Sequence, residues 1–253
     1  MSRSPGRNSY VVIPARLDST RLPRKLLLKE TGKSVLQHTY EAASGATKPL
    51  GICVAADHEE IAAEVRSFGG RVLMTDPAAS GTDRVAQVAR DREDLDIIVN
   101  VQGDEPQIAA PLIDRVIQML EDNPQAVMAT LATPIRQWAR LDDPACVKVV
   151  FDRSGRAMYF SRSPLPHPGV RDDRLLNANP ALFHQHIGVY AYRRDFLVWL
   201  AELPVGSLEK TEGLEQLRVL EAGFDILVGV VDQPTRGIDT VEDYRAFVRQ
   251  MRT

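Results

Sequence analysis

Apolar runs and amphipathic segments alternate along the first half of the chain, and this alternation limits the possible folds more than any other feature. Short apolar runs at 10–14 and 96–101 are typical of buried strands, whereas 34–44 and 110–123 carry apolar residues at helical spacing. Such alternation predicts an α/β fold with a mostly parallel sheet and helices on both faces. In chain order we expect strands at 10–14, 50–56, 71–74, 96–101 and 127–132, and helices at 34–44, 58–68, 81–90 and 110–123. We expect Asp57 to cap the second of these helices.

The pattern changes after residue 132. Strand-like runs at 147–151 and 156–160 flank Asp152-Arg153-Ser154-Gly155, a turn sequence that predicts an antiparallel hairpin. Residues 161–180 are rich in Pro, Asn and Asp and predict a long loop. The elements expected after this loop are a strand at 186–192, a helix at 207–222 with Ser207 as its N-cap, a strand at 226–231, and a helix from 240 to 251 that opens with a Thr240/Asp243 capping box. We therefore expect one domain over 1–253, with a smaller antiparallel subdomain inserted at about 133–222.

The composition excludes several classes of protein. A net charge of −3 over 253 residues gives no general attraction for a polyanion, so we expect no nucleic acid among the partners. Apolar runs such as 97–101 and 226–231 are too short to span a bilayer, and residues 1–9 lack the apolar region of a signal peptide. We therefore expect a cytoplasmic protein that binds no membrane. Cys53 and Cys146 are too few for a disulfide framework or a four-ligand zinc site.

A basic loop follows the first expected strand. Residues 14–25 contain the cations Arg16, Arg21, Arg24 and Lys25 together with two hydroxyl side chains. Ligands of open α/β sheets bind beyond the carboxyl ends of the strands, and charge-assisted contacts from Arg and Lys suit a nucleoside triphosphate. A solvated basic loop is the alternative. The loop has neither the P-loop nor the dinucleotide-binding glycine pattern, so the sequence supports neither a P-loop ATPase nor a nicotinamide enzyme.

Two carboxylates stand where a metal ion could bind. Asp104 follows the apolar strand 96–101, and Asp239 precedes the last helix. Mg²⁺ takes one or two carboxylates together with phosphate oxygens and water, so the sharper hypothesis pairs these two residues on magnesium. The alternative is that Asp104 stabilises a turn and that Asp239 caps a helix.

Other polar residues are less specific. His184 and His186 point the same way on a strand, but two imidazoles without a third ligand make a weak zinc site, so hydrogen bonding is the expected role. Glu209, Glu212 and Glu215 recur at helical spacing, which on most helices indicates a solvated face.

Nine segments occur in a characteristic order between residues 10 and 240. They are Val12-Ile13-Pro14-Ala15-Arg16, Ser19-Thr20-Arg21-Leu22-Pro23 with Lys25, Ser80-Gly81-Thr82-Asp83-Arg84, 100–106, Val147-Lys148-Val149-Val150, Tyr159-Phe160-Ser161-Arg162, His186-Ile187-Gly188-Val189-Tyr190, Leu214-Glu215-Gln216-Leu217-Arg218, and 237–240. Together they closely resemble the 3-deoxy-manno-octulosonate (KDO) cytidylyltransferase family, also called CMP-KDO synthetases. The resemblance implies a Rossmann-like nucleotidyltransferase sheet.

The resemblance also implies roles for individual residues. The nucleotide-binding residues that it implies are Ala15, Arg16, Ser19, Arg21, Lys25, Ser80, Arg84 and Gln102. The sugar-binding residues are Gln102, Arg162, His186, Tyr190, Glu212 and Gln216. Arg16, Lys25, Asp104 and Asp239 are the implied catalytic residues, with Asp104 and Asp239 as the Mg²⁺ ligands.

The implied activity is transfer of CMP from CTP to KDO, for glycan synthesis of the lipopolysaccharide type, by a homodimer. Alternatives are activation of another sugar acid, such as 8-amino-KDO or neuraminic acid, or a regulatory protein that binds nucleotide without turnover. The sequence departs from the family pattern at two places, one in the phosphate loop and one in a loop that bears on the choice of acceptor. Arg24 stands where the family usually has Gly, and the loop that begins at Ser161-Arg162-Ser163-Pro164 diverges from the family.

Overall fold

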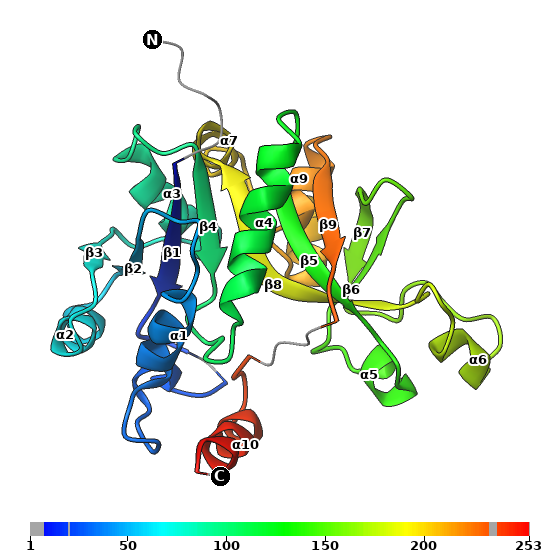
Figure 1. Cartoon of the computed structure of the whole chain (residues 1–253), viewed down its shortest axis with the longest axis horizontal. Helices are drawn as coiled ribbons and strands as arrows, with labels where there is room; N and C mark the ends of the chain where they lie inside the picture. The colour runs from blue at the N-terminus through cyan, green and yellow to red at the C-terminus, as the bar shows by residue number, and fades with distance from the viewer. Residues whose placement is uncertain (1–7, 20, 233–236, 253) are drawn as a thin grey trace.

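The computed structural model describes residues 8–19, 21–232 and 237–252, and within them the chain forms a nine-stranded β-sheet (Figure 1). Seven strands lie in the order β3-β2-β1-β4-β8-β5-β9, and β6 and β7 extend from β8. The strands are β1 (Ser9–Ala15), β2 (Ile52–Ala56), β3 (Val72–Met74), β4 (Ile97–Val101), β5 (Met128–Pro134), β6 (Lys148–Phe151), β7 (Ala157–Ser161), β8 (His184–Arg193) and β9 (Ile226–Val230). Thr20, one of the hydroxyls of the basic loop, lies outside the described residues.

The sheet is mostly parallel, as the sequence predicts. β1 pairs in parallel with β2 and β4, β2 with β3, and β5 with β9. β8 runs antiparallel between β4 and β5. The expected hairpin is present as β6 and β7. The range 133–222 is not a separate unit, because β8 falls within it and lies in the middle of the main sheet.

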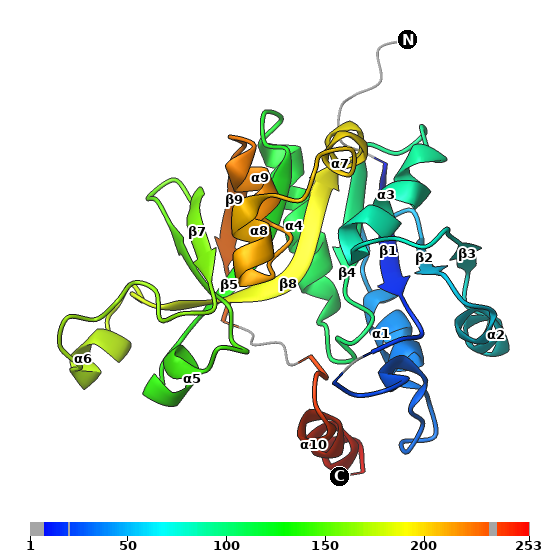
Figure 2. The same ribbon diagram turned by 180° about the vertical axis from the view of Figure 1, so that it is seen from behind.

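Helices cover both faces of the sheet. They are α1 (Val35–Ala43), α2 (Glu59–Ser67), α3 (Gly81–Arg90), α4 (Ala110–Asp122), α5 (Trp138–Asp142), α6 (Asp173–Leu176), α7 (Arg194–Leu200), α8 (Ser207–Glu212), α9 (Leu217–Glu221) and α10 (Val241–Met251), with a 3-10 turn η1 at Lys25–Leu27. Figure 1 shows α1 and α4 in front of the sheet, and Figure 2 shows α7, α8 and α9 in front of its other face. Alternate residues of β1 enter different cores, since Val11 and Ile13 pack with α1 and α4 whereas Val12 packs with α3 and α7.

The sequence did not predict α5 and α7, and α6 lies inside the loop expected at 161–180. Among the described residues, no helix is long and apolar enough to cross a membrane.

Two predicted helix starts are wrong. α2 is capped by His58, whose side chain accepts a hydrogen bond from the Glu60 amide at 3.2 Å, because Asp57 binds an arginine of the neighbouring helix instead. Ser207 is the first residue of α8 rather than its N-cap, which is Gly206. The Thr240/Asp243 capping box of α10 is confirmed.

The single helix expected at 207–222 is two helices. Gly213 ends α8 in the left-handed conformation, with φ 64°, and its amide hydrogen-bonds to the Glu209 carbonyl oxygen at 2.8 Å. Glycine adopts this conformation without a steric penalty, so it stops the helix. The chain then turns before α9, and residues 214–216 leave the helical surface that the spacing of the glutamates predicted.

Arg24 also has a left-handed backbone, with φ 55°, and it is the non-glycine residue among those described that has a positive φ. This conformation explains why glycine suits the position. The Arg24 side chain forms an ion pair with Glu60 of α2, and both side chains are about half exposed. The structure therefore keeps the backbone path that a glycine would take and directs the added charge towards α2.

We expect two substitutions of Arg24 to separate backbone strain from the ion pair. Arg24→Val should lower the free energy of unfolding by about 1–2 kcal/mol, because a β-branched residue is poorly tolerated at positive φ. Arg24→Gly should stay within about 1 kcal/mol of the wild type, since relief of strain offsets the loss of an exposed ion pair and the added freedom of the unfolded chain. Urea denaturation of both variants measures the difference, and equal stabilities would contradict this reading.

Candidate active site

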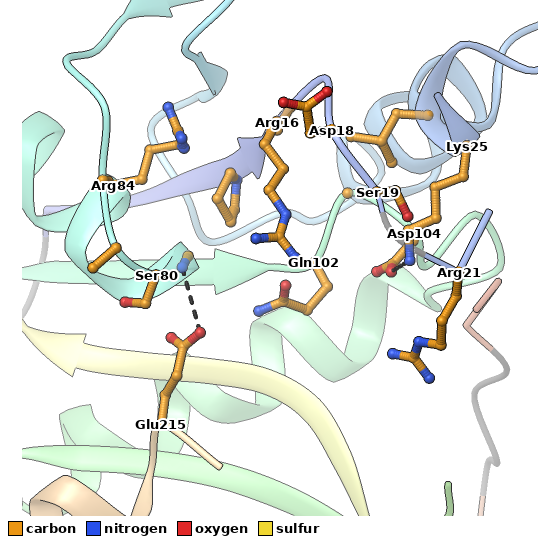
Figure 3. A pocket seen from close by; sticks show the side chains of 17 residues that line it. Arg16, Asp18, Ser19, Arg21, Lys25, Ser80, Arg84, Gln102, Asp104 and Glu215 are labelled. Carbon is orange, nitrogen blue, oxygen red and sulfur yellow. Dashed lines mark hydrogen bonds and ion pairs between the residues drawn. The ribbon is translucent and has the colours of Figure 1, made fainter. Parts of the chain in front are cut away.

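The largest group of predicted site residues lines one cavity at the carboxyl ends of β1 and β4 (Figure 3). Its walls come from the loop after β1, the start of α3 and the loop after β4. This is the place where ligands bind in open α/β sheets. The predicted residues that line it are Ala15, Arg16, Ser19, Arg21, Lys25, Ser80, Arg84, Gln102 and Asp104. We call it the nucleotide cavity.

The two strand-end loops approach each other closely. A side chain at Gly103 would place its Cβ 3.1 Å from the Pro14 carbonyl oxygen, so only glycine allows this approach without a shift. The Gly103 carbonyl oxygen accepts a hydrogen bond of 2.9 Å from the Thr39 hydroxyl of α1, which fixes the loop that carries Asp104.

Lys25 joins the two predicted metal ligands. Its ammonium donates hydrogen bonds to Asp104 Oδ2, to Asp239 Oδ1 at 3.2 Å and to the Ile238 carbonyl oxygen at 3.0 Å. Arg21 Nη2 forms an ion pair with Asp239 Oδ1 at 3.0 Å. Figures 1 and 2 place α10, which follows Asp239, at the end of the sheet towards which β1 and β4 point. The structure therefore brings Asp104 and Asp239 together around one cation.

Arg84 is held rigidly at the edge of the nucleotide cavity. It is only 4% exposed, and its guanidinium donates to Asp57 Oδ2 at 2.7 Å and to Thr75 Oγ1 at 2.6 Å. Its helix α3 is capped by Ser80, whose hydroxyl accepts a hydrogen bond from the Asp83 amide at 3.0 Å.

A second cavity lies beside the first, and we call it the acceptor cavity. Of the predicted sugar-binding residues it is lined by His186, Tyr190 and Gln216, and it is also lined by Asp239. Arg21 lines both cavities. Gln102 lines the nucleotide cavity, and its Cγ would lie 3.8 Å from a Cβ at Gly188, which lines the acceptor cavity.

Three of the polar side chains that line the acceptor cavity, those of His186, Tyr190 and Gln216, are uncharged. Burial lowers the pKa of His186 to about 3, and its Nε2 lies 3.0 Å from the Thr130 hydroxyl. Burial also raises the pKa of Tyr190 well above its ordinary value. The Tyr190 hydroxyl lies 3.4 Å from Gln216 Oε1, while the buried Gln216 Nε2 has no hydrogen-bond partner among the described residues. These groups can donate and accept hydrogen bonds without adding charge.

Arg162 and Glu212, the other two predicted sugar-binding residues, do not line this cavity. Arg162 donates to the carbonyl oxygens of Glu212 at 2.8 Å and Pro144 at 3.2 Å. Glu212 accepts hydrogen bonds from the Ser161 hydroxyl at 2.7 Å and from the Arg162 amide at 3.0 Å. In this structure the two residues join β7 to the end of α8.

Comparison with known proteins decides the family. The family model described as "Cytidylyltransferase" matches residues 10–226. A curated 3-deoxy-manno-octulosonate cytidylyltransferase of Rhodopirellula baltica is 52% identical to this chain, over 95% of the chain and 97% of the relative. The chain belongs to the 3-deoxy-manno-octulosonate cytidylyltransferase family. It is a nucleotidyltransferase, as the sequence predicts.

Two further similarities refine this assignment. An 8-amino-3,8-dideoxy-manno-octulosonate cytidylyltransferase of Shewanella woodyi is 45% identical to the chain, over 94% of each protein. The solved structure of a CMP:2-keto-3-deoxy-manno-octonic acid synthetase complexed with CTP is 39% identical and superposes with a TM-score of 0.88, over 97% of this chain and 98% of that one. The fold and the family are therefore established together.

Sequence reasoning missed two residues of the site. Glu215 lines the nucleotide cavity, although its helical spacing suggested a solvated face. Asp57 holds Arg84, although it was expected to cap α2. A signal for Asp57 was available, because it follows β2 directly and so lies at the carboxyl edge of the sheet. Glu215 carries no comparable signal, since its partners lie more than 130 residues away in sequence.

We expect Asp57→Ala to destabilise the protein by about 2–3 kcal/mol, because Arg84 would remain buried without its carboxylate partner and Asp57 itself is partly exposed. The variant should also bind CTP more weakly, since the Arg84 guanidinium would lose its fixed position. Urea denaturation and nucleotide titration measure the two effects. Asp152→Ala, which removes an exposed ion pair in the β6–β7 turn, is the control and should leave CTP binding unchanged.

Proposed function

We propose that this chain transfers CMP from CTP to 3-deoxy-manno-octulosonate and releases pyrophosphate. The observation that carries the proposal is the junction of the two cavities. Lys25 binds Asp104 of the nucleotide cavity and Asp239 of the acceptor cavity, and Arg21 lines both. A phosphate held at this junction would face a hydroxyl that enters from the acceptor cavity.

The nucleotide cavity suits a triphosphate because cations converge in it. Arg16, Arg21 and Lys25 come from one loop and line this cavity, and Figure 3 shows Arg16 extending into the space between Ser80 and Asp104 and Lys25 reaching Asp104. In the proposed reaction the anomeric 2-hydroxyl of the sugar acid attacks the α-phosphate of CTP in line with the leaving pyrophosphate. The P–O bond to the new ester forms as the bond to pyrophosphate breaks, and the proton of the attacking hydroxyl passes to solvent. The arginines and Lys25 offset the charge on the equatorial and leaving oxygens.

The chemistry of the donor set fits magnesium. Asp104, Asp239 and the Ile238 carbonyl supply hard oxygen atoms, of the kind that Mg²⁺ prefers, around the position that the Lys25 ammonium takes in this structure. Within the described residues, no group of three or more His, Cys, Asp or Glu side chains could hold a metal ion, which fits an ion that completes its shell with phosphate oxygens and water. Asp104 and Asp239 would hold it. When bound, the ion would polarise the phosphate and lower the pKa of a coordinated hydroxyl.

The acceptor cavity suits a neutral polyhydroxyl chain with one carboxylate. His186, Tyr190 and Gln216 offer uncharged donors and acceptors for hydroxyl groups. Arg21 and Arg140 line the same cavity, where they pair with Asp239 and Asp143, and they are the cations that a sugar carboxylate would meet there. The proposed roles of Arg162 and Glu212 would require them to exchange their present hydrogen bonds for contacts with the sugar.

The proposal includes a homodimer in the cytoplasm and a sugar-binding and dimerisation role for part of 133–222. These features come from the family resemblance. Sedimentation velocity at several concentrations measures the oligomeric state.

A pyrophosphate-release assay tests the activity. CTP and KDO should give pyrophosphate and CMP-KDO only with Mg²⁺ present, and replacing CTP by UTP should abolish most of the rate. Parallel reactions with 8-amino-KDO and neuraminic acid decide among acceptors, and faster turnover of either would overturn the choice of KDO. CTP binding without release of pyrophosphate from any acceptor would instead indicate a non-catalytic nucleotide-binding protein.

A further inference from the structure

The carboxylate of Glu215 is attached to the first turn of α3. Its Oε2 accepts hydrogen bonds from the Thr82 amide at 3.0 Å and from the Thr82 hydroxyl at 2.5 Å, and its Oε1 lies 3.4 Å from the Gly81 amide (Figure 3). These amides are among those that a helix leaves unpaired at its start, where a negative charge is favourable. Glu215 therefore binds the same helix end that lines the nucleotide cavity through Ser80 and Gly81.

The next residue faces the other cavity. Gln216 lines the acceptor cavity, where its side chain lies beside the Tyr190 hydroxyl, while Glu215 lines the nucleotide cavity. Two consecutive residues thus form part of the wall between the cavities. Because Gly213 interrupts the helix just before them, the helical hydrogen bonds of α8 do not continue through this segment. Among the described residues, the segment's backbone is bound from one side only, by the Arg218 and Val219 amides of α9, which donate to the Glu215 and Gln216 carbonyl oxygens at 3.2 Å.

A second contact ties the same region to α3. Arg218 donates two hydrogen bonds to Glu209, of 2.6 and 2.7 Å, and its Nη1 lies 3.3 Å from Asp83 Oδ1. Three successive residues of α3, from Gly81 to Asp83, are therefore bound by the segment that contains Glu215 and Gln216. The contact of Arg218 with Asp83 fixes the start of α9. The contact of Glu215 with Thr82 fixes the turn at residues 214–216, between α8 and α9.

We propose that Glu215 is a positioning residue that aligns the acceptor cavity with the nucleotide cavity. By binding the start of α3 it holds the turn that presents Gln216 to the sugar acid, so that the acceptor hydroxyl meets the α-phosphate at the correct distance. This role rests on the proposed CMP transfer. Small displacements of reacting groups have large effects on rate, so a looser turn lowers the efficiency of acceptor use even where both substrates still bind.

The test compares Glu215→Gln with a matched control, Glu221→Gln. Glu221 makes the same kind of contact, since it accepts from the Ser207 amide at 3.0 Å, the Ser207 hydroxyl at 2.6 Å and the Leu208 amide at 3.0 Å at the start of α8. It is exposed and lines neither cavity. Each variant keeps the side-chain shape and removes the charge. Both variants lose a carboxylate at a helix start, but only Glu215→Gln should disturb the alignment of the two cavities.

With KDO as acceptor and CTP saturating, Glu215→Gln should lower kcat/KM for KDO by about 10- to 100-fold. The dissociation constant of CTP, titrated without acceptor, should change by less than about threefold. Glu221→Gln should stay within about twofold of the wild type in both quantities, because its contact lies away from the substrates. A positioning role for Glu215 is supported if kcat/KM for KDO falls while the dissociation constant of CTP stays nearly constant.

Thr82→Val keeps the proposal testable if Glu215→Gln folds poorly, because it removes only the hydroxyl from the contact and leaves the amide bond in place. It should lower kcat/KM for KDO by about threefold to 10-fold, and its effect should largely disappear in the Glu215→Gln background. Equal kcat/KM in Glu215→Gln and Glu221→Gln would overturn the role of Glu215, and so would a parallel loss of CTP affinity. Failure of the wild-type enzyme to release pyrophosphate would instead overturn the proposed function.

Discussion

Asp104→Asn is expected to lower kcat for pyrophosphate release by about 10³-fold, because charge stabilisation at a transferring phosphate is worth several kcal/mol. Asparagine keeps the shape of the side chain but removes the negative charge that faces the Lys25 ammonium. It also removes one of the two carboxylates that would hold Mg²⁺. The concentration of Mg²⁺ needed for half-maximal activity should therefore rise as kcat falls, and both are measured by titrating Mg²⁺ at saturating CTP and KDO.

The fold should survive this substitution. Lys25 keeps its hydrogen bonds to Asp239 Oδ1 and to the Ile238 carbonyl oxygen, so the ammonium does not lose all its partners. Asp122→Asn makes the same chemical change on the surface of α4, where the carboxylate accepts a hydrogen bond of 2.7 Å from the Gln118 side chain, and it should leave kcat unchanged. An Asp104→Asn enzyme with kcat within tenfold of the wild type and an unaltered Mg²⁺ requirement would refute the role assigned to Asp104.

The sequence predicted well those features that depend on local patterns. The alternation of apolar strands and amphipathic helices gave the parallel part of the sheet, and the rule that ligands bind beyond strand ends led to the nucleotide cavity. Arg16 and Lys25 follow β1, and Asp104 follows β4, so their convergence needs only that these strands pair in parallel. Asp239 joins them because α10 lies at that same end of the sheet.

The sequence could not predict contacts that depend on distant parts of the chain. β8 enters the sheet between β4 and β5 in the antiparallel direction, and no local pattern specifies its neighbours. The left-handed turn at Gly213 moves Glu215 from an expected solvated face onto α3, and a regular helical spacing conceals such a turn. Arg162 illustrates the limit of a family motif, because its residue type predicts a charge but not the carbonyl groups that the guanidinium binds.

Glu209→Leu is expected to lower the free energy of unfolding by about 3–5 kcal/mol, since removing one partner of a buried ion pair leaves the other charge uncompensated. Glu209 and Arg218 are 6% and 4% exposed and share two hydrogen bonds. Hydrogen bonding to Glu209 raises the pKa of Arg218, so the guanidinium stays charged when its partner is lost. Asp83, at 3.3 Å, is too weakly placed to replace the carboxylate. Urea denaturation measures the loss.

A double variant separates the electrostatic cost from the cost of repacking. Glu209→Leu combined with Arg218→Met removes both charges, and well-packed apolar residues often replace a buried ion pair at little cost. The double variant should therefore recover at least about 2 kcal/mol relative to Glu209→Leu alone. Equal instability of the single and double variants would mean that packing, not the unpaired arginine, determines the loss. Because α9 carries Arg218 and follows the turn at Glu215, recovered stability without recovered kcat/KM for KDO would show that this ion pair also helps to position that turn.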